Sequence, residues 1–472
     1  MSFIDERKAL TREKRLSALS HYDGSFQNLA DEVQGAEIKQ RIRTLSQSTY
    51  DEILYALQTL SGIEETAIIV HGAIGCAASI LRQNQLGQVH WYSTNLNERD
   101  TILGGDEKLR KAVLRAYEEV HAKVIFIVGT PVVAINNDDV NSVILELEEE
   151  ICAKIISIAT DGFKTKAPAT GYDIVLHSLL RYVVDRGAIN NAEKEDFINV
   201  VTLSENKENV AAIVKILRDL EIPFQLLPQY ADVRNIERAG KARATITLNP
   251  DEGGYFAKEL EEVFGVRYIR TSVPIGLRGT RHLILKLARE LGMEQRAKRY
   301  IEAQEGQAEK LLHRKPLDGK SVFLDIDLAN AIHFTDLIEK LGGEVYELGV
   351  PYIDLENREN LSKLTTLGNA VPVVVANGQL FEKANILHKK QPDYYISLKG
   401  QVGFAAEEGS IPVSIRNAGY IGYEGIAKFV NILERAKEGT GVYDFRANKQ
   451  DPLYKTSWLN KSSNWYVKQE VK

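Results

Sequence analysis

The sequence of 472 residues contains only two cysteines, Cys76 and Cys152, which lie far apart and form no CxxC pair. A zinc ribbon, a self-contained iron–sulfur ligand run and a secreted disulfide framework each need more thiols than this. Only 12 residues are proline and 44% are hydrophobic, which excludes a disordered or fibrous chain. What remains is a globular protein with enough residues for about two to four domains.

Basic residues are also too few for a nucleic-acid partner. The chain has 59 Lys and Arg against 65 Asp and Glu, a net charge of −6, whereas phosphate neutralisation needs a basic surface. Apolar runs such as Val124–Val128 are strand-sized, far below the ~20 residues that span a bilayer, so we expect no membrane association. Residues 1–15 mix both charges without an apolar core, so we expect no secretory signal and a cytoplasmic location.

Short β-branched runs alternate with amphipathic stretches along most of the chain, which is typical of parallel sheets covered by helices. The predicted helices are Ala77–Arg82, Asp138–Ile151, Glu208–Leu220, Thr280–Leu291, Ala329–Leu341 and a long charged helix within 293–320. The predicted strands are Thr66–Val70, His90–Tyr92, Val124–Val128, Ile155–Ala159, Asn199–Leu203, Phe224–Leu227, Ala244–Leu248, Ser321–Ile326, Glu344–Leu348, Val371–Val375 and Tyr394–Ser397. The predicted fold class is therefore α/β, with three Rossmann-like domains.

Two polar segments, 185–196 and the end of the charged helix near 315–319, mark the expected domain boundaries. We assign 1–195 to a first α/β domain that carries Cys76, and 196–317 to a second Rossmann-like domain with the bridging helix. Residues 318–440 form a third Rossmann-like domain. Residues 441–472 form an aromatic-rich arm, which we expect to pack on its own or a neighbouring subunit.

The most informative segment is His71-Gly72-Ala73-Ile74-Gly75-Cys76, directly after a predicted buried strand. Gly72 and Gly75 permit a sharp turn that brings the Cys76 thiol to the carboxyl end of a parallel strand, where ligands of open α/β sheets bind. A thiol before a helix favours metal ligation, because the helix N-terminus lowers its pKa. The alternative is a small buried residue in a tight turn, which is common for cysteines outside disulfides.

The strand Val124–Val128 likewise ends in a turn, Gly129-Thr130-Pro131. We place Thr130 in the same carboxyl-end crevice as Cys76, and we expect Asn137 or Asp138 to cap the following helix. A third loop, Asp161–Thr165, could contact an anionic ligand or simply connect two elements. The other cysteine, Cys152, falls outside any motif, and we expect it to be a buried structural thiol.

Taken in order, these segments resemble the nitrogenase component 1 family, which comprises the molybdenum–iron protein chains, their cofactor-assembly scaffold relatives and the chlorophyllide-type reductases. His71–Cys76 resembles the family's HGxxGC, and Val128–Pro131 with Asn137–Asp139 resembles its STCPxxxxGDD. Shorter matches follow in the same order at Thr94–Gly105, Thr160–Phe163, Thr170–Tyr172, Pro274–Gly276 and Gly422–Gly425. A series of motifs in order is more specific than any one of them.

The resemblance implies two paired homologous subunits, an iron–sulfur cluster at their interface and electrons from a separate ATP-dependent iron–sulfur reductase. Of three family cysteines, Cys76 matches the second, Thr130 stands at the third, and the segment Thr44–Tyr50 lacks the first. Such clusters take about four thiolates. We therefore expect Cys76 to be the one metal ligand that this chain gives to a shared cluster, of the 4Fe-4S type, with Gly72, Gly75 and Thr130 around it.

The resemblance further predicts that a homologous alpha-type subunit supplies the other three thiolates, which makes this chain closest to a beta-type subunit. No cysteine follows residue 196, and the segment before Gly422 has no histidine, so we do not expect this chain to hold the large active-site cofactor itself. The predicted function is a subunit of a nitrogenase-like two-component reductase or of a cofactor-assembly complex.

Three alternatives remain at this point. The chain could be a non-catalytic scaffolding subunit without a cluster, or a homodimeric reductase in which two Cys76 thiols share one. A nucleotide-sugar or periplasmic-type binding fold agrees with the topology but not with the motifs.

Overall fold

The computed structural model places the apolar runs of the chain in parallel strands. It describes residues 18–19, 21–33, 52–73, 75–76, 90–160, 170–189, 193–203, 205–354, 357, 361, 371–376, 380–398, 400, 402–439, 441 and 453–462. These residues fall into two compact units. The first lies within 50–204 and 223–270, and the second within 16–49, 205–222 and 271–472.

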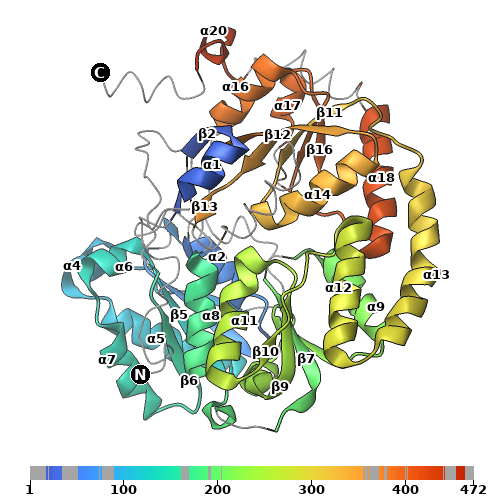
Figure 1. Cartoon of the computed structure of the whole chain (residues 1–472). Coiled ribbons are helices and arrows are strands. Elements are labelled where there is room, and N and C mark those ends of the chain that lie inside the picture. Colours follow the sequence, from blue (N-terminus) through green and yellow to red (C-terminus); the bar gives the residue numbers. More distant parts are fainter. Residues whose placement is uncertain are drawn as a thin grey trace. The chain divides into compact units, whose positions relative to one another are not determined.

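The first unit contains two four-stranded sheets in which all strands are parallel, with the orders β4-β3-β5-β6 and β10-β9-β7-β8 (Figure 1). Every residue of β3 is buried, as expected for a parallel strand covered on both faces. The strands are β3 Thr66–His71, β4 His90–Ser93, β5 Val124–Gly129, β6 Lys154–Ile158, β7 Glu195–Thr202, β8 Phe224–Pro228, β9 Ala242–Thr247 and β10 Arg267–Tyr268.

The helices of the first unit connect and cover these strands. They are α2 Glu52–Leu60, α4 Glu98–Leu103, α5 Asp106–Val120, α6 Pro131–Asn136, α7 Val140–Glu148, α8 Thr170–Tyr182, α10 Val233–Glu237 and α11 Pro250–Phe264, with the 3-10 helices η3 Arg186–Ala188 and η4 Arg238–Lys241.

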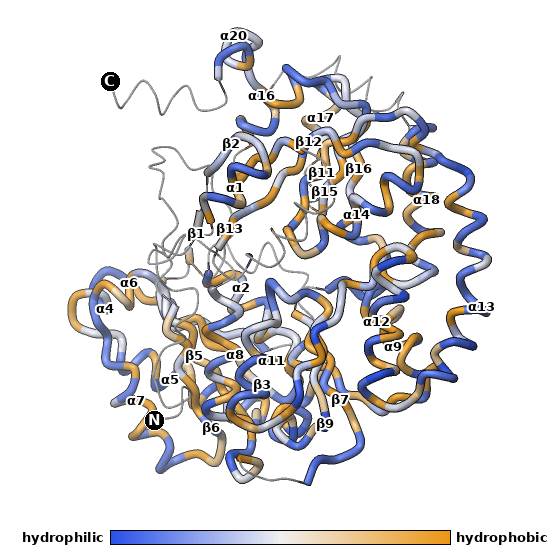
Figure 2. Tube along the Cα trace, in the orientation of Figure 1, coloured by the Kyte–Doolittle hydropathy of each residue, from blue (hydrophilic) through white to orange (hydrophobic). Residues whose placement is uncertain are grey.

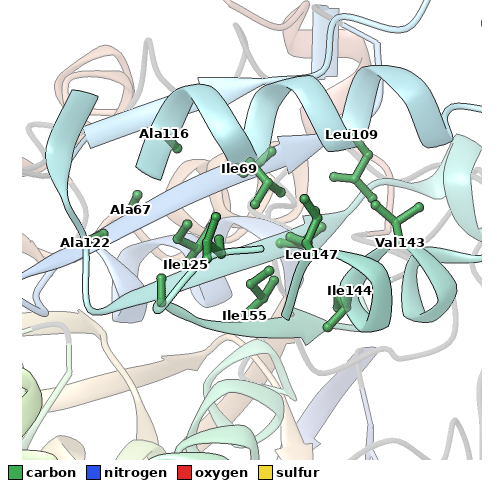
Figure 3. Close-up of a cluster of buried hydrophobic side chains, with 14 residues drawn as sticks. Ala67, Ile69, Leu109, Ala116, Ala122, Ile125, Val143, Ile144, Leu147 and Ile155 are labelled. Atoms are coloured by element: carbon green, nitrogen blue, oxygen red, sulfur yellow. The ribbon is translucent and has the colours of Figure 1, made fainter. Parts of the chain in front are cut away.

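One apolar cluster holds α5 and α7 against the first sheet. In Figure 3 the side chains of both helices meet those of β3, β5 and β6. Burying each large aliphatic side chain contributes roughly 1.5–3 kcal/mol, so this cluster stabilises the sheet that carries the predicted site. Its members are Ala67, Ile69, Leu109, Val113, Ala116, Ala122, Ile125, Ile127, Val143, Ile144, Leu147, Ile151, Ala153 and Ile155.

The second unit is built on a six-stranded sheet of order β16-β15-β11-β12-β14-β2, in which only β2 runs antiparallel to its neighbour. In Figure 2 the central strands of this sheet contain segments in the hydrophobic colour, whereas the edge strand β2 does not. The strands are β2 His21–Ser25, β11 Ser321–Asp325, β12 Glu344–Val350, β14 Pro372–Ala376, β15 Tyr394–Ser397 and β16 Ile411–Ser414, with a separate antiparallel pair β1 Ala18–Leu19 and β13 Ile353–Asp354.

The helices of the second unit include the long charged helix, which ends at Leu312 rather than near residue 320. They are α1 Phe26–Val33, α9 Lys207–Asp219, α12 Gly276–Leu291, α13 Glu294–Leu312, α14 Leu328–Lys340, α16 Leu380–Lys390, α17 Phe404–Glu407, α18 Gly422–Glu438 and α20 Thr456–Leu459. Within the C-terminal arm, Leu459 is buried in the core of this unit, and Asn385 Nδ2 donates to its carbonyl at 2.6 Å. The described part of the arm therefore packs on its own chain.

The predicted α/β class with parallel sheets is confirmed, and the predicted strands are all present with small shifts at their ends. The predicted helix Asp138–Ile151 is shorter, because α7 spans Val140–Glu148 and a separate helix, α6, precedes it. The predicted helix Ala77–Arg82 lies outside the described residues. The division into three domains and an arm stays a prediction. Among the described residues, no helix has the length and apolarity that crossing a membrane requires.

Helices α2 and α8 of the first unit pack closely together, and this contact depends on Gly171. A Cβ atom on Gly171 would lie 2.0 Å from the carbonyl oxygen of Glu52 and 2.9 Å from the amide nitrogen of Ala56. Both are backbone atoms, so a side chain at this position has to push the two helices apart.

We therefore expect Gly171→Ala to lower the free energy of unfolding by about 1–3 kcal/mol, measured by urea denaturation. The matched control is Gly254→Ala in α11, where no atom lies within 4 Å of an added Cβ. That change is expected to be neutral or stabilising by up to about 1 kcal/mol, since alanine is the better helix former. Equal stability of both variants would contradict the packing described here.

Candidate functional site

The predicted site lies where β3 and β5 end side by side. Residues His71 and Gly129 are register partners at the carboxyl ends of these parallel strands. After His71 the chain turns, and the amide of Cys76 donates to the carbonyl of Ala73 at 3.1 Å. Cys76 is half-buried and Gly75 is exposed. The structure therefore brings the motif cysteine to the sheet edge that the sequence predicts.

The turn after β3 touches Thr130, at the end of β5. A Cβ atom on Gly72 would lie 2.0 Å from Thr130 Oγ1, so only glycine fits at this position. No atom lies within 4 Å of a Cβ added to Gly75, whose space is open. The close approach of the turn to Thr130 therefore explains why position 72 is glycine. It does not explain why position 75 is glycine.

Thr130 is completely buried beneath this turn. Its amide donates to the carbonyl of His71 at 3.1 Å, and α6 begins at the next residue. Its hydroxyl oxygen has no hydrogen-bond partner among the described residues. At the end of the next strand, Thr160 donates its hydroxyl to the carbonyl of Gly129 at 2.6 Å. Thr130 thus packs against the turn that carries Cys76, and its side chain lies in the protein interior.

His71 and Thr94 fix the turn from the other side. His71 is completely buried, with Nδ1 3.1 Å from Thr94 Oγ1, and the same oxygen accepts the amide of Gly72 at 2.9 Å. The amide of Leu96 in turn donates to the carbonyl of Gly72 at 2.9 Å. The loop after β4 is therefore hydrogen-bonded to both sides of the Gly72 peptide.

The second nitrogen of His71 faces a carboxylate. His71 Nε2 lies 3.4 Å from Asp138 Oδ2, and neither atom makes a hydrogen bond among the described residues. Burial lowers the pKa of His71 to about 4, and burial, with a contribution from Asp106, raises the pKa of Asp138. The imidazole is therefore neutral at pH 7, and this contact is not a full ion pair.

Gly105 leaves room for this pair. A Cβ atom on Gly105 would lie 2.9 Å from His71 Cε1 and 3.1 Å from Asp138 Oδ2. From the sequence, Thr94 and Gly105 were expected only as parts of a longer motif and Asp138 as a possible helix cap, and none of them was connected with His71. The available signal was that Thr94 and Gly105 follow β4 and Asp138 follows β5, the two strands that flank β3 in one parallel sheet.

Two expectations about this region need correction. The residue that caps α7 is Asp139, which accepts the amide of Ser142, whereas Asn137 ends α6 in a left-handed conformation and Asp138 faces His71. Cys152 is exposed rather than buried, because its neighbours Ile151 and Ala153 take the inward positions.

Two further segments that the sequence singled out lie outside the described residues. They are Thr44–Tyr50, where the first family cysteine is missing, and the loop Asp161–Thr165. What is expected of them stays a prediction.

An exposed apolar patch lies on the short helices α4 and α6, which follow β4 and β5, the two neighbours of β3. Ile102, Leu103 and Ile135 are 81%, 71% and 71% exposed, and we call these three residues the α4–α6 patch. Asn136 Nδ2 donates to the carbonyl of Thr101 at 3.0 Å and so joins the two helices. In Figure 2 both helices contain segments in the hydrophobic colour. Exposed apolar side chains gathered on one surface are typical of protein–protein contacts.

A family model described as Nitrogenase component 1 type Oxidoreductase matches residues 53–436. The chain belongs to this family. The nitrogenase iron-molybdenum cofactor biosynthesis protein NifE of Clostridium pasteurianum is 28% identical over 336 residues, which cover 66% of this chain and 70% of that protein. The nitrogenase molybdenum-iron protein alpha chain of Methanosarcina barkeri is 24% identical over 380 residues, 74% of this chain and 69% of that one.

The fold is also that of a solved nitrogenase component 1 structure. "Nitrogenase Cp1 at pH 6.5" superposes with a TM-score of 0.74 at 18% identity, covering 90% of this chain and 98% of that one. The family that the ordered motifs predict is therefore confirmed, together with its fold. The beta-type assignment stays a prediction, and one of the relatives above is named an alpha chain.

Membership of the nitrogenase component 1 family raises the question of how much of a cluster this chain can hold. Among the described residues, no group of three or more His, Cys, Asp or Glu could bind a metal ion. The donor set at the Cys76 turn is one thiol, with Thr130 buried below it and His71 turned toward Asp138. These residues do not fit a complete cluster, and they fit the donation of a single ligand.

The buried imidazole makes stability depend on pH. Above about pH 6.5 His71 is neutral in both the folded and the unfolded state, so its contribution is fully present. As the pH falls from 6.5 toward 4, the unfolded chain binds a proton at His71 that the folded chain does not, so the contribution of His71 to the free energy of unfolding decreases. We expect this contribution to fall by about 2 kcal/mol between about pH 7 and pH 5, measured by urea denaturation as the difference between the wild type and His71→Gln.

In His71→Gln this part of the pH dependence should disappear, although the variant is less stable at every pH. The exposed residue His313 provides the control, since His313→Gln should keep the wild-type slope. The assignment fails if His71→Gln loses as much stability over this pH range as the wild type does.

Proposed function

We propose that this chain is a subunit of a nitrogenase-like two-component reductase or cofactor-assembly complex, in which Cys76 gives one thiolate to an iron–sulfur cluster shared with a homologous subunit. The observation that carries this proposal is the place of Cys76. It lies half-buried at the carboxyl end of β3, on a turn that Gly72 allows to pack against Thr130. Ligands of open α/β sheets bind at this end of the strands.

The number of thiols points to a shared cluster. Iron–sulfur clusters are held by about four thiolates, and Cys152 is on the surface outside the motifs. A 4Fe-4S cluster with one ligand from Cys76 therefore takes three from the alpha-type partner. When bound, the cluster would supply one-electron transfer. The residues of this chain would orient its thiol, since Thr94 and Leu96 hold the Gly72 peptide on one side and Thr130 supports it on the other.

The names of the relatives cover both parts of this proposal, because they include a cofactor biosynthesis protein and a molybdenum–iron protein chain. A scaffolding subunit without a cluster is the second candidate, and the single thiol among the described motif residues favours it. A homodimer with two Cys76 ligands is the third. The iron content of defined assemblies separates all three.

The chain should be co-purified with its homologous partner as wild type, Cys76→Ala and Cys152→Ala, and its iron and visible absorbance measured. We expect Cys76→Ala to lower the iron content and change the absorbance of the cluster, whereas Cys152→Ala matches the wild type because that thiol is exposed and outside the site. Iron bound by the isolated chain would support the homodimer instead.

The cluster proposal is refuted if Cys76→Ala carries the same iron, with the same spectrum, as the wild type. Absence of iron from every assembly, including the wild-type complex, would support the scaffolding subunit.

We further propose that the α4–α6 patch is where the ATP-dependent iron–sulfur reductase docks. The patch belongs to α4 and α6, which follow β4 and β5, the two strands that flank β3, so a donor bound there lies at the end of the sheet that carries the thiol. It is formed by only a few exposed residues. This small size agrees with a transient electron-transfer contact, because such contacts bury little surface area, whereas permanent subunit interfaces bury much more.

Leu103→Ser should raise the reductase concentration needed for half-maximal reduction by about tenfold, the effect of losing about 1.4 kcal/mol of apolar contact. The thermal stability should not change, because Leu103 is 71% exposed. Leu145→Ser, at an exposed position on α7, is the control. If the two variants require the same reductase concentration as the wild type, the patch is not the docking surface.

A further inference from the structure

A cavity of the first unit opens at the other end of its strands. It has a volume of about 840 Å³ and is lined by the first residues of β6 and β7, the end of α8, and the segment from η3 to η4 through α10. Because β6 is parallel to β3, this is the amino end of the sheet, opposite the end that carries Cys76. The cavity volume is that of a small-molecule site.

Cations dominate the lining. Three carboxylates are present, and two of them are occupied, since Glu195 pairs with Arg238 at 2.7 Å and Asp185 lies 3.6 Å from Lys241. The whole chain carries a net charge of −6, so a local positive excess is a specific feature of this cavity. The six cations are Lys154, Arg181, Arg186, Arg234, Arg238 and Lys241.

Helix ends explain part of this arrangement. Arg181 and Arg234 lie in the last turns of α8 and α10, where a cation interacts favourably with the helix dipole, and Lys154 donates to the carbonyl of Tyr182. The dipoles of α8 and α10 do not account for Arg186 and Arg238, which start the separate 3-10 helices η3 and η4. Cations from several elements therefore converge on one cavity.

An aromatic ring lines the same cavity. Tyr182 is 41% exposed, and the guanidinium carbon of Arg181 lies 5.2 Å from the centre of its ring. The guanidinium carbon of Arg238 also lies 4.1 Å from the centre of a second ring, that of Phe197. Exposed aromatic rings beside cations bind nucleobases by stacking, while guanidinium groups bind phosphate oxygens through paired hydrogen bonds.

We propose that this cavity binds a nucleoside diphosphate or triphosphate, with its phosphates held by the guanidinium groups of Arg186 and Arg234 and its base against Tyr182. The ligand approaches neither Cys76 nor the turn that carries it, because the two lie at opposite ends of one parallel sheet. The proposal is therefore independent of the cluster assignment, and it adds a second, anionic ligand to this chain.

The test is calorimetric titration of the full-length chain with ADP and, separately, with inorganic pyrophosphate. The double variant Arg186→Ala/Arg234→Ala should weaken binding of both probes about tenfold or more. Tyr182→Ala should weaken ADP binding about fivefold and leave pyrophosphate binding unchanged, because only ADP carries a base. The control Lys111→Ala removes an exposed cation of α5 that pairs with Glu107 outside the cavity, and it should leave both affinities unchanged.

Failure of the wild-type chain to bind either probe overturns the proposal, as does an undiminished affinity in the double variant. Equal loss of ADP binding in Lys111→Ala would show a non-specific charge effect and also overturns it. If ADP and pyrophosphate bind alike in the wild type and in Tyr182→Ala, the nucleoside part is wrong. If neither probe binds and the double variant no longer co-purifies with the homologous subunit, the cavity is a protein-binding surface.

Discussion

The candidate site depends on one steric constraint, the contact between the turn after β3 and the end of β5. The backbone of Gly72 lies so close to Thr130 that no side chain fits between them. This contact determines the path of the chain toward Cys76, and the hydrogen bonds from Thr94 and Leu96 stabilise the same path from the opposite side. The position of the thiol therefore follows from the packing of neighbouring strand ends in one sheet, which α5 and α7 hold from one face.

The electrostatics of the site follow from the same packing. The ring of His71 is sealed between the loop after β4 and Asp138, and burial keeps it neutral. A neutral imidazole beside the turn adds no positive charge near the thiol. The ends of β3 and β5 thus place one half-buried residue, Cys76, on a turn that packs closely against buried neighbours.

Much of this could be predicted from the sequence, because β-branched runs mark the parallel strands and chemistry-bearing residues follow their ends. Gly72, Thr130 and Cys76 could be placed at one edge of the sheet, since they follow strands that were expected to be parallel neighbours. The pairing of His71 with Asp138 could not be predicted, because it depends on the left-handed conformation of Asn137, which redirects the chain directly after the short helix α6.

The edge strand β2 has a consequence for the synthesis of the protein. Asp23 in β2 is the register partner of Val374 in β14, about 350 residues later in the chain. At translation rates of about 5–20 residues per second, the segment that becomes β2 leaves the ribosome roughly 20–70 s before its partner strand exists. The first unit can complete its sheets during that interval, whereas the six-stranded sheet closes only near the end of translation. Ribosome-bound intermediates therefore have an unpaired strand that chaperones can recognise.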